Sequence, residues 1–148
     1  MRVRPFLFVL AAGVYAAVSL SAQDQKTTRD AVYTEAQAER GKAFFGTVCA
    51  KCHATATVAG APRLEGPVLG GDLFFNNWED KSVFDLATNI RLGMPPDGSV
   101  TVDPKQAADV IAYLLQVNKL PAGQTELPAD NTARAIKIMR PAGVPAAR

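Results

Sequence analysis

The sequence predicts an all-α fold of three to four helices joined by long loops. Two observations indicate this fold class. Three segments repeat apolar residues at helical spacing, and each follows a residue that can cap a helix. A stretch rich in glycine and proline separates the first segment from the second, and no regular element is expected there. Strand-like alternation occurs only weakly, near residues 135–139, so a sheet is not expected.

The N-terminus is typical of a signal peptide over residues 1–22. Arg2 and Arg4 precede an apolar run at 6–18, and small residues suited to cleavage follow at 19–22. The run is short for a membrane span, which needs about 20 residues, so cleavage is expected and an uncleaved anchor is the alternative. A signal peptide predicts a periplasmic or otherwise exported protein. The rest of the 148 residues suits one domain with tails.

The charge balance argues against a nucleic-acid partner. The sequence has 16 Lys and Arg and 14 Asp and Glu, and loss of residues 1–22 would remove two arginines and no acid. The mature chain would be close to neutral, which gives no strong attraction to nucleic acid or to an anionic membrane. A membrane contact is therefore expected only if the N-terminal segment is uncleaved. The polar residues 23–32 are expected to form a flexible lead.

The first helix is expected from about Glu35 to Cys49, behind a capping box formed by Thr34 and Gln37. Apolar or small residues at helical spacing form one side of it: Ala38, Gly41, Phe44 and Phe45. Glycine inside a helix costs about 1 kcal/mol relative to alanine. Gly41 therefore indicates a packing requirement, such as the close approach of another helix.

The stretch Cys49-Ala50-Lys51-Cys52-His53 matches C-x-x-C-H, the attachment signal for c-type haem. Thiols three residues apart on a helical turn lie on the same face, so they can form thioethers with two vinyl groups on one edge of a porphyrin. The imidazole of His53 is then expected to be the proximal ligand of the haem iron. The expected cofactor is one covalently attached haem c with its iron.

Other interpretations of this motif are weaker. A disulfide would leave His53 without a role, and a thioredoxin-like pair needs a βαβ context, whereas the surrounding sequence looks helical. A structural zinc site needs four Cys or His ligands. The sequence contains two cysteines and one histidine, which is too few for such a site.

Residues 54–72 are expected to form one long loop, because glycine and proline recur throughout them. Long ordered loops in small domains are usually functional, and this one would wrap one side of the haem. An aromatic cluster for the core or the porphyrin follows, made of Phe74, Phe75 and Trp78. Trp78 is either a core residue or a donor to a haem propionate, whereas Arg63 and Arg91 are expected to be solvated.

A second helix is expected from about Val83 to Arg91. A capping box of Ser82 with Asp85 begins it, and Gly93 is expected to end it as a C-cap. Its apolar face consists of Val83, Leu86, Ala87 and Ile90.

The last helix is expected to begin at Pro104 behind the capping residue Asp103 and to end near Asn118. Its apolar stripe consists of Ala107, Val110, Ile111, Leu114 and Leu115. Residues 124–148 follow as a C-terminal extension. A mobile terminus is the default expectation for this extension, and a segment that docks on a partner subunit is the alternative.

A proximal histidine leaves one axial position of the iron for another ligand. The sequence contains no second histidine, and apart from Met1 it contains two methionines, Met94 and Met139. Met94 is the stronger candidate because the prolines at 95 and 96 hold it off any helix face. A thioether ligand favours Fe(II) and raises the reduction potential. The metal ligands are therefore expected to be His53 and Met94, and the haem-binding residues these two with Cys49 and Cys52.

These motifs, in this order, resemble a class I c-type cytochrome over about residues 33–123. The matching residues are Gly41, Phe45, the C-x-x-C-H motif, Gly66-Pro67-x-Leu69-x-Gly71, Met94-Pro95-Pro96 and Val110-Ile111-Ala112-Tyr113-Leu114. The resemblance implies the cytochrome c fold, with a contact of Gly41 and Phe45 against Val110 and Tyr113. It also implies that the carbonyl of Pro67 accepts a hydrogen bond from His53. The sequence from Ala112 to Gly123 further resembles bacterial periplasmic members that accompany dehydrogenases.

The function implied is one-electron transfer between exported redox partners, a donor dehydrogenase and an acceptor oxidase or cytochrome. With both axial positions filled, no catalytic residue is expected and the chain is not expected to be an enzyme. Three alternatives are kept. The chain could be the electron-accepting haem subunit of a periplasmic dehydrogenase complex, a small haem peroxidase with an open iron position, or an interaction subunit that binds through residues 124–148.

Overall fold

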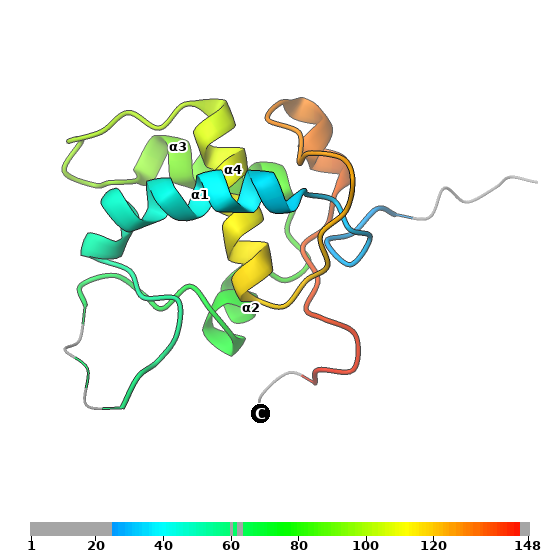
Figure 1. Ribbon diagram of the computed structural model, residues 1–148, viewed down its shortest axis with the longest axis horizontal. Coiled ribbons are helices and arrows are strands. Elements are labelled where there is room, and N and C mark those ends of the chain that lie inside the picture. Colours follow the sequence, from blue (N-terminus) through cyan, green and yellow to red (C-terminus); the bar gives the residue numbers. More distant parts are fainter. Residues whose placement is uncertain (1–24, 60, 62–63, 146–148) are drawn as a thin grey trace, which may run out of the picture.

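The computed structural model describes residues 25–59, 61 and 64–145. Its elements, in chain order, are α1 (Glu35–Thr47), the 3₁₀ turn η1 (Cys49–Lys51), α2 (Asp72–Trp78), α3 (Val83–Gly93), α4 (Pro104–Val117) and the 3₁₀ turn η2 (Asn131–Ala135) (Figure 1). Within these residues there is no strand, only two isolated bridges. The prediction of an all-α fold is confirmed. The predicted signal peptide lies outside the described residues, and none of the helices within them could cross a membrane.

The helices α1 and α4 cross at the centre of the domain (Figure 1). At the crossing, a Cβ on Gly41 would collide with the backbone carbonyl of Asp109, which explains a glycine inside α1. Beside it, the rings of Phe45 and Tyr113 pack with centroids 5.3 Å apart and planes inclined by 56°. This is the contact between first and last helices that the resemblance implied. It forms one side of the core.

Residues 72–78 form α2. The loop predicted over residues 54–72 is therefore wrong at residue 72, which already belongs to the helix. Gly71 is the N-cap of α2 and adopts a positive φ of 65°, a conformation that glycine reaches without steric cost. Its N–H donates to Oδ1 of Asn118 at the end of α4 (2.8 Å). Phe74 and Phe75 are buried, so the aromatic cluster is the inner face of a two-turn helix.

The ends of α3 and α4 follow local chemistry. The predicted capping box of Ser82 with Asp85 is present, and Asp103 caps α4 as predicted, in a capping box completed by Gln106. The expected C-cap at Gly93 is wrong, because Gly93 is still helical and the C-cap is Met94, which is extended at φ −127° and ψ 138°. A residue that precedes proline is pushed out of the helical region, so the ring of residue 95 explains this ending.

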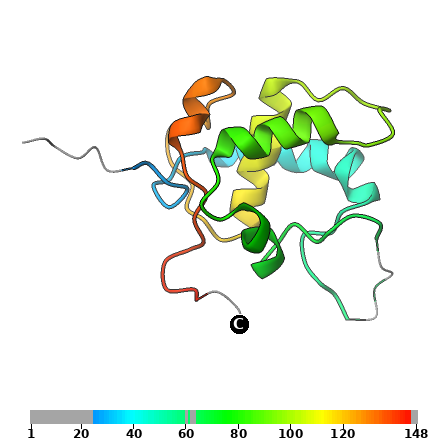
Figure 2. The ribbon, with the colours of Figure 1, turned by 180° about the vertical axis from the view of Figure 1, so that it is seen from behind.

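The predictions of a flexible lead and a mobile C-terminus are wrong for residues 25–32 and 124–145. The two segments lie side by side (Figures 1 and 2), with backbone hydrogen bonds from Thr28 N to Lys137 O (2.8 Å) and from Lys137 N to Lys26 O (2.9 Å). Apolar side chains of the C-terminal segment complete the core: Leu127, Ala133, Ile136 and Ile138. Residues 124–145 are therefore part of the domain.

Gln37 anchors the beginning of this C-terminal segment. Thr34 caps α1 by accepting from the backbone of Gln37, as predicted, but the side chain of Gln37 does not complete the capping box. It is buried and bonds instead to the backbone of Leu127, donating to the carbonyl (3.1 Å) and accepting from the N–H (2.7 Å). The side chain of Gln37, which the local motif assigned to the end of the helix, is therefore hydrogen-bonded to a segment far away in the sequence.

Candidate haem site

A cavity of about 470 Å³ opens between the 3₁₀ turn η1, the helices α2 and α3, and the end of the loop before α2. This volume lies in the usual range for sites that bind a small molecule or cofactor, about 300–1,000 Å³. Its walls are largely apolar and come from all four helices: Phe45, Val68, Leu69, Leu73, Phe74, Leu86, Ile90, Val102, Val110 and Leu114. Walls of this kind suit the face of a large flat macrocycle.

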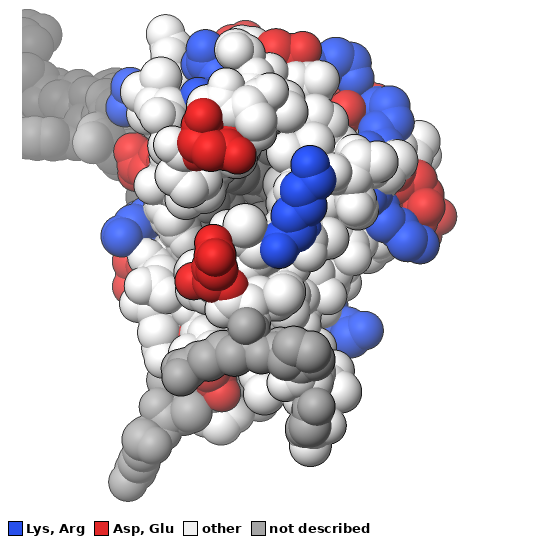
Figure 3. Space-filling view, turned by 90° about the vertical axis from the view of Figure 1, so that its left-hand side faces the viewer, with Lys and Arg blue, Asp and Glu red and all other residues white. Residues whose placement is uncertain are grey.

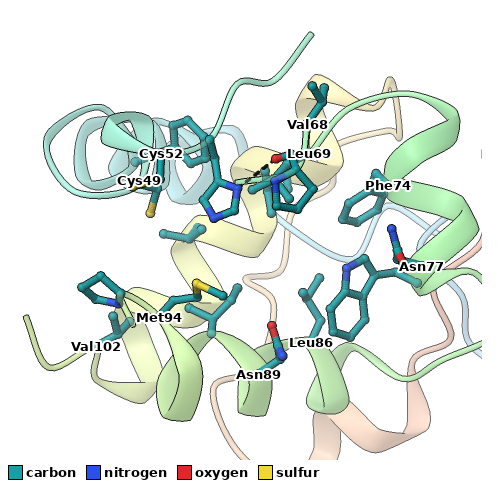
Figure 4. A pocket seen from close by; sticks show the side chains of 18 of the residues that line it. Cys49, Cys52, Val68, Leu69, Phe74, Asn77, Leu86, Asn89, Met94 and Val102 are labelled. Carbon is teal, nitrogen blue, oxygen red and sulfur yellow. Dashed lines mark hydrogen bonds between the residues drawn. The ribbon is translucent and has the colours of Figure 1, made fainter. Parts of the chain in front are cut away.

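Cys49, Cys52 and His53 line one wall of the cavity. The helix α1 ends at Thr47, two residues earlier than expected, and Cys49 begins the tighter turn η1. Residues three apart eclipse one another in a 3₁₀ turn, so both sulfur atoms lie on one side of it, as Figure 4 shows. Both cysteines are free of disulfides. Burial raises the pKa of the Cys49 thiol, so it stays protonated at neutral pH until it is alkylated.

The ring of His53 is oriented by the loop that follows it. Nδ1 of His53 lies 2.9 Å from the carbonyl oxygen of Pro67. Because a carbonyl can only accept, Nδ1 carries a proton, and in the neutral ring Nε2 then has the lone pair that a metal needs. Gly66 packs on the same ring, since a Cβ there would lie 2.5 Å from Cε1 of His53. The Gly66-Pro67 pair therefore sets both the tautomer and the position of the imidazole.

Met94 lines the cavity from the end of α3, together with the two prolines that follow it. Figure 4 shows its thioether directed into the cavity, across from Cys49 and Cys52. The other candidate, Met139, is not part of the lining, and its backbone is bonded to the hydroxyl of Thr28. The structure thus gathers Cys49, Cys52, His53 and Met94 around one cavity and leaves Met139 out.

Polar side chains lie where α2 and α3 line the cavity. Asn77 and Asn89 contribute to the lining, on the side away from the cysteines in Figure 4. Trp78 also lines it, and the ammonium of Lys81 lies 4.9 Å from the centre of the indole ring. Sequence reasoning named Trp78 but missed the other three. Helical spacing could have found Asn89, since it lies three residues after the inward-facing Leu86.

Of the two arginines that the sequence predicts to be solvated, only Arg91 lies in the part of the chain that the structure describes. Arg91 is exposed and is not part of the cavity lining, as expected for a solvated side chain. Arg63 lies outside the described residues. Polar groups for buried carboxylates are instead available from the α2 and α3 side of the cavity.

The donor set suits haem iron better than a bare metal ion. No group of three or more His, Cys, Asp or Glu in the described part of the chain could hold an ion. An imidazole nitrogen and a thioether sulfur on facing walls are, however, a common pair of axial ligands for haem iron, because the porphyrin supplies the other ligands. Apolar walls, two adjacent thiols and a polar side for the propionates complete the fit.

Among the residues that the structure describes, the surface at the side of η1 carries no large patch of one charge sign (Figure 3). Figure 3 shows this side of the molecule, the left-hand side of Figure 1, with acidic and basic side chains interspersed. Strong electrostatic steering needs a patch of one sign, which this face does not offer.

Comparison with known proteins agrees with this geometry. Residues 36–114 match the family model described as cytochrome C oxidase, cbb3-type, subunit III. The match runs from the first turn of α1 into α4 and includes all four candidate haem-binding residues. No curated protein and no solved structure matches the chain.

Proposed function

Because the chain belongs to the cytochrome c family of this cbb3-type subunit III model and is a class I c-type cytochrome, we propose that it carries single electrons through one haem. In this proposal Cys49 and Cys52 attach the haem covalently, and His53 and Met94 ligate its iron. Its coarser part, a haem-based electron carrier, follows from the family. The residue assignment is supported by the convergence of these four side chains on one cavity.

The proposal rests on one observation. The imidazole of His53, oriented by its hydrogen bond, and the thioether of Met94 line facing walls of this cavity. The haem would supply a one-electron couple. The hydrogen bond from His53 to the Pro67 carbonyl fixes the ring and makes Nε2 a better donor. The Met94 thioether would fill the remaining axial position and favour the reduced state. The apolar walls would keep water from a haem bound in this cavity, which would limit the rearrangement that accompanies electron transfer.

A single haem is supported by the sequence itself. It contains two cysteines and one histidine, enough for one attachment motif. The same count leaves no histidine for a second haem bound in this way.

For partners, we propose an exported donor dehydrogenase and an acceptor oxidase or cytochrome. The matching family model is named for an oxidase subunit, which agrees with an oxidase as acceptor. A role as the electron-accepting subunit of a dehydrogenase complex is the second form of the same proposal. Docking through residues 124–145 is less well supported, because Leu127, Ile136 and Ile138 of this segment are already buried in this chain's own core.

Replacing Met94 by alanine tests the ligand pair. Met94→Ala is expected to lose the absorbance band of the sulfur–iron bond and to bind cyanide or carbon monoxide rapidly. Met139→Leu is the matched control, because it alters the other methionine away from the cavity, and it should keep the band. A band that survives in Met94→Ala would overturn the assignment. Rapid carbon monoxide binding by the unaltered protein would favour a peroxidase instead.

A further inference from the structure

The C-terminal residues 136–140, called here the brace, form an extended segment between two other parts of the chain. On one side they bond to the N-terminal lead, through Lys26 and Thr28. On the other side they bond to residues 80–83, the connection between α2 and α3 (Figure 2). This second set comprises bonds from Asp80 N to Ile138 O, from Ile138 N to Lys81 O and from Val83 N to Ile136 O, each 2.9 Å long.

Arg140 fixes the brace to both ends of α2. Its side chain is 6% exposed, with Nη1 2.8 Å from Oδ1 of Asp72 and Nε 2.8 Å from Oε2 of Glu79. Asp72 is the first residue of α2 and Glu79 is its C-cap. The guanidinium also lies 5.2 Å from the ring centre of Phe75, within the helix. One buried cation therefore pairs with a carboxylate from each end of α2.

The opposite side of the same wall faces the cavity. Phe74, Asn77 and Trp78 line the cavity from α2, and Lys81 lines it from the connection held by the brace. The helix α3 begins two residues later, at Val83, and ends at Gly93, directly before the candidate ligand Met94. It also packs on η2, immediately before the brace. Movement of the brace would thus be transmitted to the wall that carries Trp78 and Met94.

We propose that the brace is a positioning element for the haem, with Arg140 as its anchor residue, holding the α2–α3 wall so that Met94 stays on the iron. The inference rests on the proposed function. The brace lies outside residues 36–114, the part of the chain that matches the family model. Neither Arg140 nor its two carboxylate partners line the cavity, so they act through the wall and not by contact.

If the brace holds Met94 in place, loosening the brace should change the fraction of molecules in which the sixth coordination position of the iron is open. An external ligand such as imidazole binds only when Met94 is off the iron, so its apparent affinity is proportional to the open fraction. Loss of the anchor should raise that fraction. Arg140→Lys should have an intermediate effect, because one ammonium cannot reproduce the planar fork that reaches two carboxylates.

The test compares Arg140→Ala with Gln37→Ala in the haem-loaded full-length protein. Gln37→Ala loosens the C-terminal segment at Leu127 and leaves Asp72 and Glu79 untouched, so it controls for general loss of stability. Arg140→Ala should raise the apparent imidazole affinity by a factor on the order of five or more, as allosteric couplings typically do. It should also weaken the sulfur–iron band and speed amide hydrogen exchange at residues 80–83. Gln37→Ala should leave the affinity and the band unchanged.

The proposal for the brace would be overturned if Arg140→Ala and the unaltered protein bound imidazole with equal affinity. It would also be overturned if the affinity rose equally in Arg140→Ala and Gln37→Ala. If Arg140→Ala does not fold, Glu79→Gln removes one of its two charged partners and serves in its place, with the same expected direction. An unaltered protein without the sulfur–iron band would instead contradict the proposed function. The two failures are therefore distinguishable.

Discussion

Gly66 lies against the ring of His53 so closely that a Cβ on Gly66 would be 2.5 Å from Cε1 and 2.6 Å from Nδ1. A Cβ would also lie 2.8 Å from the carbonyl oxygen of Cys52. Gly66→Ala should therefore displace the imidazole and break its hydrogen bond to Pro67, at a cost of about 1–3 kcal/mol or more. We expect less haem-loaded protein and a weaker sulfur–iron band, measured by absorbance at equal protein concentration.

The control for this substitution is Gly46→Ala in α1, where a Cβ would meet no atom within 4 Å. Alanine is favoured over glycine in a helix by about 0.5–1 kcal/mol, so Gly46→Ala should be neutral or slightly stabilising. Full haem loading in Gly66→Ala, with an unchanged band, would show that the loop does not position the imidazole.

Gly41→Ala tests the crossing of α1 and α4. A Cβ here would collide with the backbone of Asp109 and lie 2.9 Å from the N of Val110. Backbone atoms cannot rotate away as a side chain can, so the helices must separate. We expect a loss of about 1–3 kcal/mol or more in the free energy of unfolding, measured with denaturant against Gly46→Ala. Equal stability of the two variants would refute the close approach.

Gln37→Ala should destabilise the protein by about 2 kcal/mol, because it leaves the buried backbone N–H and C=O of Leu127 without partners. Chemical denaturation gives the change in free energy, and limited proteolysis after residue 124 should become faster. If the C-terminal segment were mobile, as its position in the chain suggests, the substitution would change neither quantity.

Asp109 links stability to acid. Burial raises its pKa, but hydrogen bonds from Arg40 and Lys105 lower it by more, so the pKa lies below its ordinary value of 3.8. The native state therefore binds this proton less readily than the unfolded state, and the stabilisation present above pH 3.8 is lost as pH falls through the folded-state pKa. Asp109→Asn should reduce the slope of unfolding free energy against pH below about pH 5. An unchanged slope would show that Asp109 and its basic partners contribute nothing to the dependence of stability on acid.

Much of the fold could be predicted where local chemistry decides. The caps Ser82 and Asp103 mark the starts of α3 and α4 because their side chains bond within their own turn. The four candidate haem-binding residues could be named because spacing and composition alone restrict the ligands of a haem. The structure then added how the ring of His53 is held.

The remaining features depend on partners far away in the sequence. The two-turn helix α2 is too short for a clear period, and the glycines before it suggested a loop. The brace has no helical period, and its order comes from pairing with residues 26–28 and 80–83. Gln37 shows the same limit, since a buried backbone group 90 positions away outcompetes the local capping motif.

Intact mass and a visible spectrum of the purified protein test the central claim most directly. One covalently attached haem predicts a mass increased by a single haem, no free thiol at Cys49 or Cys52, and a sulfur–iron band that Met94→Ala removes. A colourless protein of unmodified mass, with both thiols free or joined in a disulfide, would contradict the account.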